Sequence, residues 1–269
     1  MKLLRGTDMS FWPVIAVATR TIKESYRVRV ALFFNFFWVI MWYFLLVYVT
    51  GNVSSLPGLM QGSAKAQIAL SMVIFGFMTT GFSSIASFVA ADRESGLYFK
   101  LLSTPLKPWQ DLVGRTLGIL LQNILLTVAV LIIAVATGAT FIVNSLFVLP
   151  QIFIIIFFVT IFSFGIGYFI ASFICRVYTA SVVGSGLVVI LSFLTGILVP
   201  VSSLPEVLRP LTSFPTTVAV NILKDLLING REVLNVQQLF YVSASSILLY
   251  IAGIIIFYYM VIHLGAEYR

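Results

Sequence analysis

Acidic side chains that could transfer protons lie close together in this sequence at Asp92, Glu94 and Asp111. A membrane-embedded enzyme such as a lipid transferase would use carboxylates, with a histidine, as acid and base at one membrane face. No histidine accompanies them, because His263 is the chain's one histidine. The sequence also lacks a GxxxxGK[ST] nucleotide loop, an HExxH metal pair and a GxSxG serine motif. We therefore expect no catalytic activity and no metal site, so energy for any work must come from another subunit.

Ion-coupled carriers need a titratable group inside the bilayer that binds and releases a proton or cation. The long apolar runs of this chain hold no Asp, Glu, Lys or Arg well inside them, and His263 falls at the end of the last run, where an interfacial position is favoured. Transport driven by protons or sodium is therefore disfavoured.

The composition is that of a membrane protein, with 60% hydrophobic and 9% charged residues. So few charges cannot cover the surface of a soluble domain of 269 residues. The net charge of +7 does not predict a nucleic-acid partner, because most basic residues lie between the apolar runs.

The apolar runs predict a single all-α transmembrane domain over 1–269 with six spans. The uncharged run 116–175 is too long for one span, and the turn residues Thr137-Gly138-Ala139-Thr140 divide it. The expected spans are about 30–50, 67–91, 113–136, 147–174, 179–199 and 239–263.

The basic residues predict that both termini are cytoplasmic, because this topology places twelve of the 16 inside and four outside. The twelve inside residues are Lys2, Arg5, Arg20, Lys23, Arg27, Arg29, Arg93, Lys100, Lys107, Arg115, Arg176 and Arg269. The four outside residues are Lys65, Arg209, Lys224 and Arg231.

An amphipathic helix on the inner membrane surface is expected before the first span. Its apolar face is Phe11, Ile15, Ala18, Ile22 and Tyr26, and its polar face is Arg20, Lys23, Glu24 and Arg27, with Glu24 able to pair with Arg20 or Arg27. A signal peptide ending at Ala18 is the alternative, but it would leave four basic residues to be translocated before the first span.

Polar residues within the spans have two interpretations. Thr79, Ser83, Gln122 and Asn123 could hydrogen-bond between helices or line a translocation path. The glycines 165, 167, 184 and 186 are expected to permit close helix contact, and Gly114-x-x-x-Gly118 is a weak dimerisation motif because it adjoins Arg115 at the cytoplasmic end of its helix.

Two loops carry the remaining information. Inside, the triplet Asp92-Arg93-Glu94 and Gly96 end the second span, and a short helix over 97–103 ends before Pro105 and Pro108. Outside, prolines 200, 205, 210 and 215 preclude a continuous helix. There, Ser203 and Glu206 have capping-box spacing, and a second helix is expected over 217–229, ended by Gly230.

These loops resemble those of ABC-2 type transporter membrane subunits, also called type V ABC exporters. The matching residues are Asp92-Arg93-Glu94-Ser95-Gly96 followed by Leu101-Leu102-Ser103-Thr104-Pro105, and Gly196-Ile197-Leu198-Val199-Pro200 followed by Leu204-Pro205. The order of the motifs and the six-span topology extend the resemblance over essentially the whole chain.

The resemblance implies a permease that forms its path with a second, identical or homologous permease chain, and that docks on an ABC ATP-binding subunit. ATP and Mg²⁺ would bind that subunit, with no cofactor in this chain. The implied coupling residues are Asp92, Arg93, Glu94, Gly96, Leu97, Leu101, Leu102, Thr104 and Pro105. The interfacial helix, with Phe11, Ile15, Arg20, Ile22, Lys23 and Arg27, would add a second contact, and a re-entrant outer segment would include Pro200, Ser203, Pro205, Glu206 and Pro210.

The expected location is the plasma (inner) membrane, among its lipids, and the expected substrate is hydrophobic or amphipathic: a drug, a lipid or a lipid-linked glycan. No span offers charged groups for an ionic substrate. The aromatic residues of the first span surround its helix, so lipid contact and packing are favoured over a path lining. A structural or enzymatic membrane subunit without transport activity is the alternative function.

Overall fold

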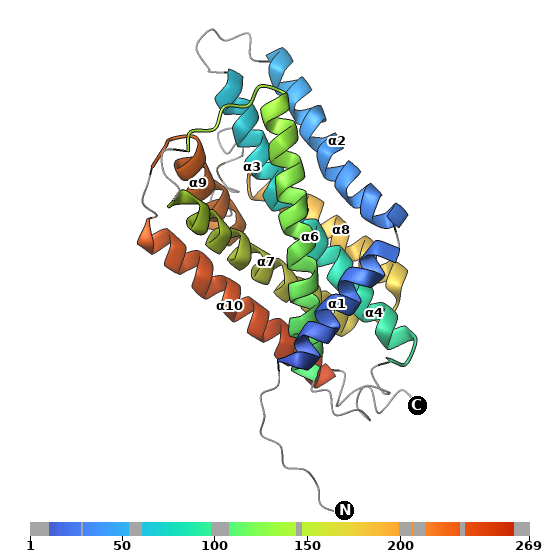
Figure 1. Ribbon diagram of the computed structural model, residues 1–269. Coiled ribbons are helices and arrows are strands. Elements are labelled where there is room, and N and C mark those ends of the chain that lie inside the picture. Colours follow the sequence, from blue (N-terminus) through green and yellow to red (C-terminus); the bar gives the residue numbers. More distant parts are fainter. Residues whose placement is uncertain are drawn as a thin grey trace, which may run out of the picture.

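The computed structural model describes residues 11–27, 29–53, 61–97, 108–143, 147–198, 206, 213–231 and 235–260, and these residues contain helices and no strand (Figure 1). The longer helices are α1 (Trp12–Arg27), α2 (Arg29–Val53), α3 (Gln61–Thr79), η1 (Thr80–Ile85), α4 (Ala86–Glu94), α6 (Pro108–Ala136), α7 (Val148–Phe173), α8 (Val177–Leu194), α9 (Pro215–Leu227) and α10 (Val236–Tyr259).

Six helical stretches of the described chain are long and apolar enough to cross a membrane, which confirms the predicted number of spans. They are Leu32–Val49, Gly62–Glu94, Trp109–Ala136, Val148–Phe173, Val177–Leu194 and Val236–Tyr259. The protein is therefore an all-α integral membrane protein.

The second span, formed by α3, η1 and α4, lies at the centre of the bundle. Of its residues 78% are buried within the bundle, against 11% for the first span, because α7 and α8 pack directly on its middle. This middle is η1, a π-helical turn, and the close approach depends on glycines: a Cβ at Gly167 would strike the carbonyl oxygen of Gly81, and one at Gly184 would strike that of Phe82. The sequence offered no signal for the π turn.

Two further glycines bring α7 and α10 together along their length. A Cβ at Gly165 would lie 2.7 Å from the carbonyl oxygen of Leu249, and one at Gly253 would strike that of Gly165. The expected role of Gly165, Gly167 and Gly184 in helix packing is confirmed. For Gly186 it is wrong, because nothing lies within 4 Å of the position of its Cβ on the open side of α8.

The end of the molecule opposite α4 is held at the predicted turn after α6. Lys65 Nζ donates a hydrogen bond of 2.8 Å to the carbonyl oxygen of Thr137, and the hydroxyls of Tyr43 and Thr137 lie 2.6 Å apart. Gly138 has φ +88°, in the left-handed region that favours glycine. These contacts tie α2, α3 and α6 together at this end.

The helix expected over 217–229 is present as α9, which begins at Pro215 because proline suits the first turn of a helix. Most of its residues are buried against α3, α7 and α10, and Gly230, at φ +65°, follows its end. Of the residues predicted for the re-entrant segment, the structure describes Glu206, which is exposed. Pro200, Ser203, Pro205 and Pro210 lie outside the described residues.

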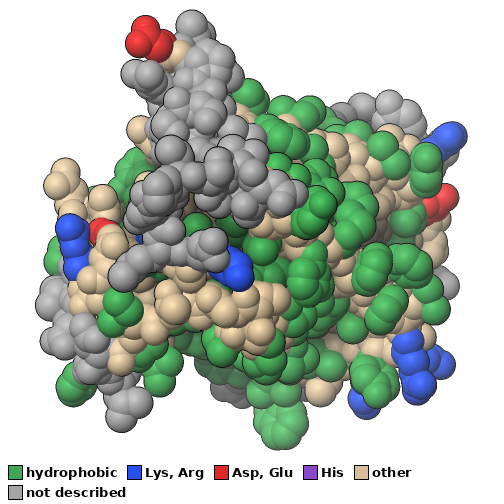
Figure 2. Space-filling model, turned by 90° about the horizontal axis from the view of Figure 1, so that it is seen from above, with side chains coloured by type: hydrophobic (Ala, Val, Ile, Leu, Met, Phe, Trp, Pro, Cys, Tyr) green, Lys and Arg blue, Asp and Glu red, His purple; other side chains and the backbone are tan. Residues whose placement is uncertain are grey.

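The surface of the bundle is apolar. Large hydrophobic side chains are exposed on most spans, among them Phe33, Leu125, Phe153, Ile190 and Leu248. Figure 2 shows the molecule from the end that is uppermost in Figure 1. Apolar side chains cover much of the visible face, and charged side chains are scattered between them. Lipid tails would cover this surface in a membrane.

Candidate functional site

The charged triplet at the end of α4 makes a different contact from each of its three residues. Asp92 forms an ion pair with Arg115 of α6, and its second carboxylate oxygen lies 3.8 Å from Nη2 of Arg20 on α1. The Asp92 side chain is 13% exposed and that of Arg115 is 5% exposed. Asp92 therefore connects the second span to both α6 and α1.

Arg93 binds the C-terminal end of α7. Its Nη1 donates hydrogen bonds to the carbonyl oxygens of Ala171 at 2.5 Å and Ser172 at 3.0 Å. The last carbonyls of a helix have no partner within the helix and carry its negative dipole end, so a guanidinium is favourable there.

Glu94 binds the beginning of α8. The backbone N–H of Val177, the first residue of α8, donates to Glu94 Oε2 at 3.3 Å. A carboxylate is favourable at the positive end of a helix. Because α7 ends and α8 begins on either side of residues 174–176, Arg93 and Glu94 together hold the link between these two spans.

Arg115 joins two carboxylates on neighbouring helices. Its Nε donates to Asp111 Oδ2 at 2.9 Å, one turn earlier on α6, while its Nη2 binds Asp92. Asp111 is 1% exposed. We call Arg20, Glu24, Asp92, Asp111 and Arg115 the inner charge cluster, after the cytoplasmic side that the sequence predicts for this end of the bundle. The i,i+4 spacing of Asp111 and Arg115 was a sequence signal for this pair, but nothing in the sequence joined either residue to Asp92.

The first helix packs on α6 through a face that the sequence analysis did not identify. Val14, Val17, Thr21 and Ser25 are its buried residues, and they lie between the two predicted faces. The contact uses Gly114 and Gly118: a Cβ at Gly114 would lie 2.6 Å from Val17 Cβ, and one at Gly118 would lie 2.9 Å from the carbonyl oxygen of Ala18. Gly114-x-x-x-Gly118 therefore serves a helix contact within the chain.

Most of the residues predicted for the interfacial helix are exposed. Phe11 and Ile15 are 69% and 54% exposed, and Lys23 and Arg27 are also exposed, while Ile22 is half-buried. Arg20 forms the predicted ion pair with Glu24, at 2.6 Å.

The predicted coupling residues are only partly described. Gly96 follows α4 with φ +68°, and Leu97 is half-buried. Leu101, Leu102, Thr104 and Pro105 lie outside the described residues.

The four predicted path residues do not gather in one place. Ser83 Oγ lies 3.2 Å from Ser181 Oγ on α8, and Thr79 donates to the carbonyl of Phe75 in its own helix. Asn123 is fully buried and accepts a hydrogen bond of 2.8 Å from Thr80, whereas Gln122 lines a cavity beside α2. Asn123 thus contributes to the contact between η1 and α6, and Gln122 borders the cavity.

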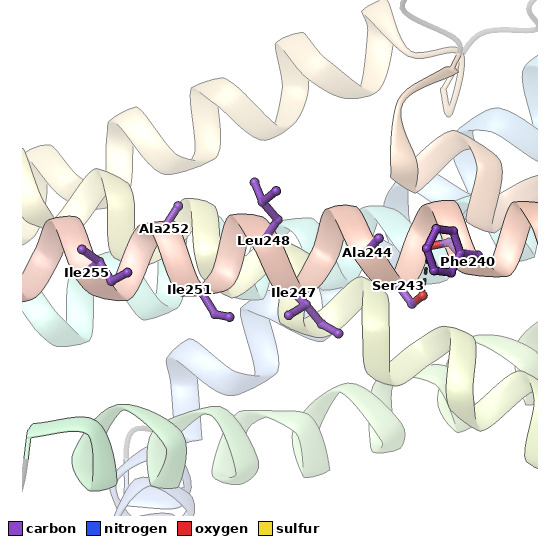
Figure 3. A pocket seen from close by; sticks show the side chains of 8 residues that line it. All are labelled: Phe240, Ser243, Ala244, Ile247, Leu248, Ile251, Ala252 and Ile255. Carbon is purple, nitrogen blue, oxygen red and sulfur yellow. Dashed lines mark hydrogen bonds between the residues drawn. The ribbon is translucent and has the colours of Figure 1, made fainter.

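A hollow of about 660 Å³ runs along α10, but its geometry is not that of a site (Figure 3). The residues around it come from α10 alone, and Ser243 is the one polar side chain among them. Its hydroxyl donates to the carbonyl of Phe240 in the same helix. This hollow is apolar outer surface.

The residues at the end of α4 connect this span to several neighbouring helices. No group of three or more His, Cys, Asp and Glu that could hold a metal occurs in the described parts of the chain. The triplet fixes the end of α4 to α1, α6, α7 and α8, so a displacement of this end would reach four helices.

The sequence profile of a family described as ABC-2 type transporter matches residues 13–228, which is most of the chain. No curated protein sequence matches it.

Proposed function

This chain belongs to the ABC-2 type transporter family, and on that premise we propose that it is the membrane subunit of an ATP-driven exporter. Members of this family are membrane transport components, and their association with an ATP-binding subunit supplies the energy. We propose that ATP and Mg²⁺ bind that partner, that a second permease chain completes the translocation path, and that the complex lies in the plasma membrane with both termini of this chain cytoplasmic.

The observation that carries the proposal is the set of contacts made by Asp92, Arg93 and Glu94. The inner loop that begins after Gly96 would be received by the ATP-binding subunit. Movement of the loop would pull on α4, and the triplet would pass the movement to the link between α7 and α8 and to α6. Rigid-body motion of packed helices is a common way to switch a path between two openings.

The first test is purification of the chain in mild detergent from its native host, followed by mass spectrometry of what remains bound. A stoichiometric subunit with a GxxxxGK[ST] loop would support the proposal. No ATPase even after crosslinking would contradict it and favour a structural or enzymatic membrane subunit.

Two substitutions separate docking from transmission. Leu101→Asp should release the ATPase while the chain still inserts, because it places a charge on the apolar side of the expected coupling helix. Arg93→Met should retain the ATPase but uncouple its ATP hydrolysis from transport, because it removes the contacts with the end of α7. The matched control is Arg176→Met, since Arg176 is exposed on the adjoining link. Equal transport by Arg93→Met and wild type would contradict the transmission role.

A further inference from the structure

A small cavity lies between the first helix, the first span and the middle of the bundle. Its volume is about 120 Å³. Five polar side chains from four helical elements line it: Ser25, Asn35, Thr80, Ser84 and Gln122. Its apolar lining is Leu32, Phe36, Phe88 and Leu126. No charged residue of the described chain lines it.

Two polar atoms at this cavity have no hydrogen-bond partner among the described residues. They are the Ser25 hydroxyl and Asn35 Oδ1, both shielded from solvent. Ser25 as a whole is 7% exposed. An unpaired buried polar group costs about 1–3 kcal/mol, so sites of this kind are normally completed by water or a ligand.

The packing of α2 explains why space remains here. The middle of α2 is fixed by Val39 and Tyr43, which are fully buried against the bundle. Figure 1 shows α2 and α6 diverging from the last residues of α2 toward its start. The cavity lies on the diverging side, and Gln122 is seven residues beyond Arg115, or about 10 Å along the helix. It is therefore on the half of the bundle that carries the inner charge cluster.

We propose that this cavity binds the uncharged polar head of an amphipathic molecule that enters from the inner leaflet between α2 and α6. Hydroxyl and amide side chains recognise neutral heads with hydroxyl, amide or ester groups, and the apolar residues would contact the start of the tail. An ionic head would find no counter-charge in the lining and would be excluded by its desolvation cost. A cavity of this size holds part of a ligand, because whole drug-sized ligands occupy about 300–1,000 Å³.

Two sources share this chemistry: a resident neutral lipid and the exported compound itself. The second source rests on the proposed function, whereas binding as such does not. The binding experiment therefore uses the full-length chain in phosphatidylcholine nanodiscs without ATP, so its failure would leave the coupling role untouched.

The probe is an alkyl glucoside with a photoreactive diazirine at the start of its chain. We expect saturable crosslinks to peptides containing residues 32–36 and 122–126, competed by unlabelled octyl glucoside. An alkyl sulfate probe of the same chain length should label these peptides ~10-fold less at equal concentration, because its charge has no partner there. Equal or stronger labelling by the sulfate would overturn the proposal.

Ser84→Leu tests the cavity itself, since the larger side chain fills it. Labelling should fall to background in this variant and stay at the wild-type level in the matched control Ser185→Leu, where the serine is exposed on α8. Ser25→Ala adds no bulk, but it removes a hydroxyl that would bond the head. Labelling should therefore weaken by about fivefold, which corresponds to the loss of one hydrogen bond. Unchanged labelling in both Ser84→Leu and Ser25→Ala would overturn the proposal and assign water to the cavity.

Mass spectrometry of co-purified lipids then separates the two sources. A neutral hydroxyl-bearing lipid retained by wild type and lost in Ser84→Leu would identify a resident lipid. Binding of the probe with no such lipid retained would support the exported compound as the ligand.

Discussion

Arg115 neutralises two largely buried carboxylates, Asp92 and Asp111, at the end of the bundle where α4 ends. With Asp111 1% exposed and Asp92 13% exposed, neither can exchange the guanidinium for bulk water. Removing one partner from such a buried group leaves uncompensated charge, which typically costs about 3–5 kcal/mol. Arg115→Met should therefore lower the free energy of unfolding by roughly that amount, measured as a large drop in the unfolding midpoint in detergent.

Arg20→Met is the matched control for this prediction. Arg20 is 40% exposed, pairs with Glu24 at the surface, and lies 3.8 Å from Asp92. Exposed ion pairs contribute about 0.2–1 kcal/mol, so its loss should change the midpoint little. Similar losses in the two variants would show that Arg115 is not the principal partner of the buried carboxylates.

At the scale of elements, the contact between α1 and α6 depends on glycine. An alanine at Gly114 would place its Cβ 2.6 Å from Val17 Cβ and 2.7 Å from the carbonyl oxygen of Val14, so α1 would have to move. At Gly186 the added Cβ meets nothing within 4 Å. The two substitutions should therefore change the free energy of unfolding in opposite directions. Gly114→Ala should lower it by about 1–3 kcal/mol, because α1 is displaced. Gly186→Ala should raise it by up to about 1 kcal/mol, because alanine has the higher helix propensity.

The unfolding midpoints of the two alanine variants in the same detergent check this prediction. Stabilisation by Gly114→Ala would mean that α1 does not pack on α6 as described. A fluorescence or crosslinking pair between α1 and α6 would show directly whether the helix has moved.

The spans were predictable because each is a long run of apolar residues, which can be read from the local sequence. The turn at Thr137 and the Arg20–Glu24 pair were predictable for the same reason, since both involve residues close together in the chain. The buried face of α1 was not, because Val14 and Val17 acquire their role only from glycines about a hundred residues later. The partners of Asp92 and Arg93 are also distant in sequence, with separations of 23 and 78 positions. Sequence periodicity reports how a helix faces its surroundings, and it contains no information on which helix becomes the neighbour.

At the scale of the whole molecule, the single cysteine reports the topology. Cys175 is exposed in the link between α7 and α8, at the end of the bundle that holds the charged triplet. The distribution of basic residues predicts that this end lies in the cytoplasm. A membrane-impermeant maleimide should therefore label Cys175 in inside-out vesicles and not in intact cells.

A variant with Cys175→Ser and Thr140→Cys supplies the reverse pattern, because Thr140 is exposed at the opposite end. Labelling of Cys175 in intact cells would contradict this prediction. It would show that the bundle has the opposite orientation, with the inner charge cluster outside the cell.

The π turn Thr80–Ile85 has a consequence for the direction in which α4 points its side chains. A π turn accommodates one residue more than an α-helical turn, and one residue corresponds to about 100° of rotation about the helix axis. Straightening this segment into regular α-helix with all of its residues retained would leave α3 in place and rotate Asp92, Arg93 and Glu94 together by about 100°, each away from its own partner. The direction in which these three charged side chains point is thus set by the π turn at the other end of α4, in a segment that contains no charged residue.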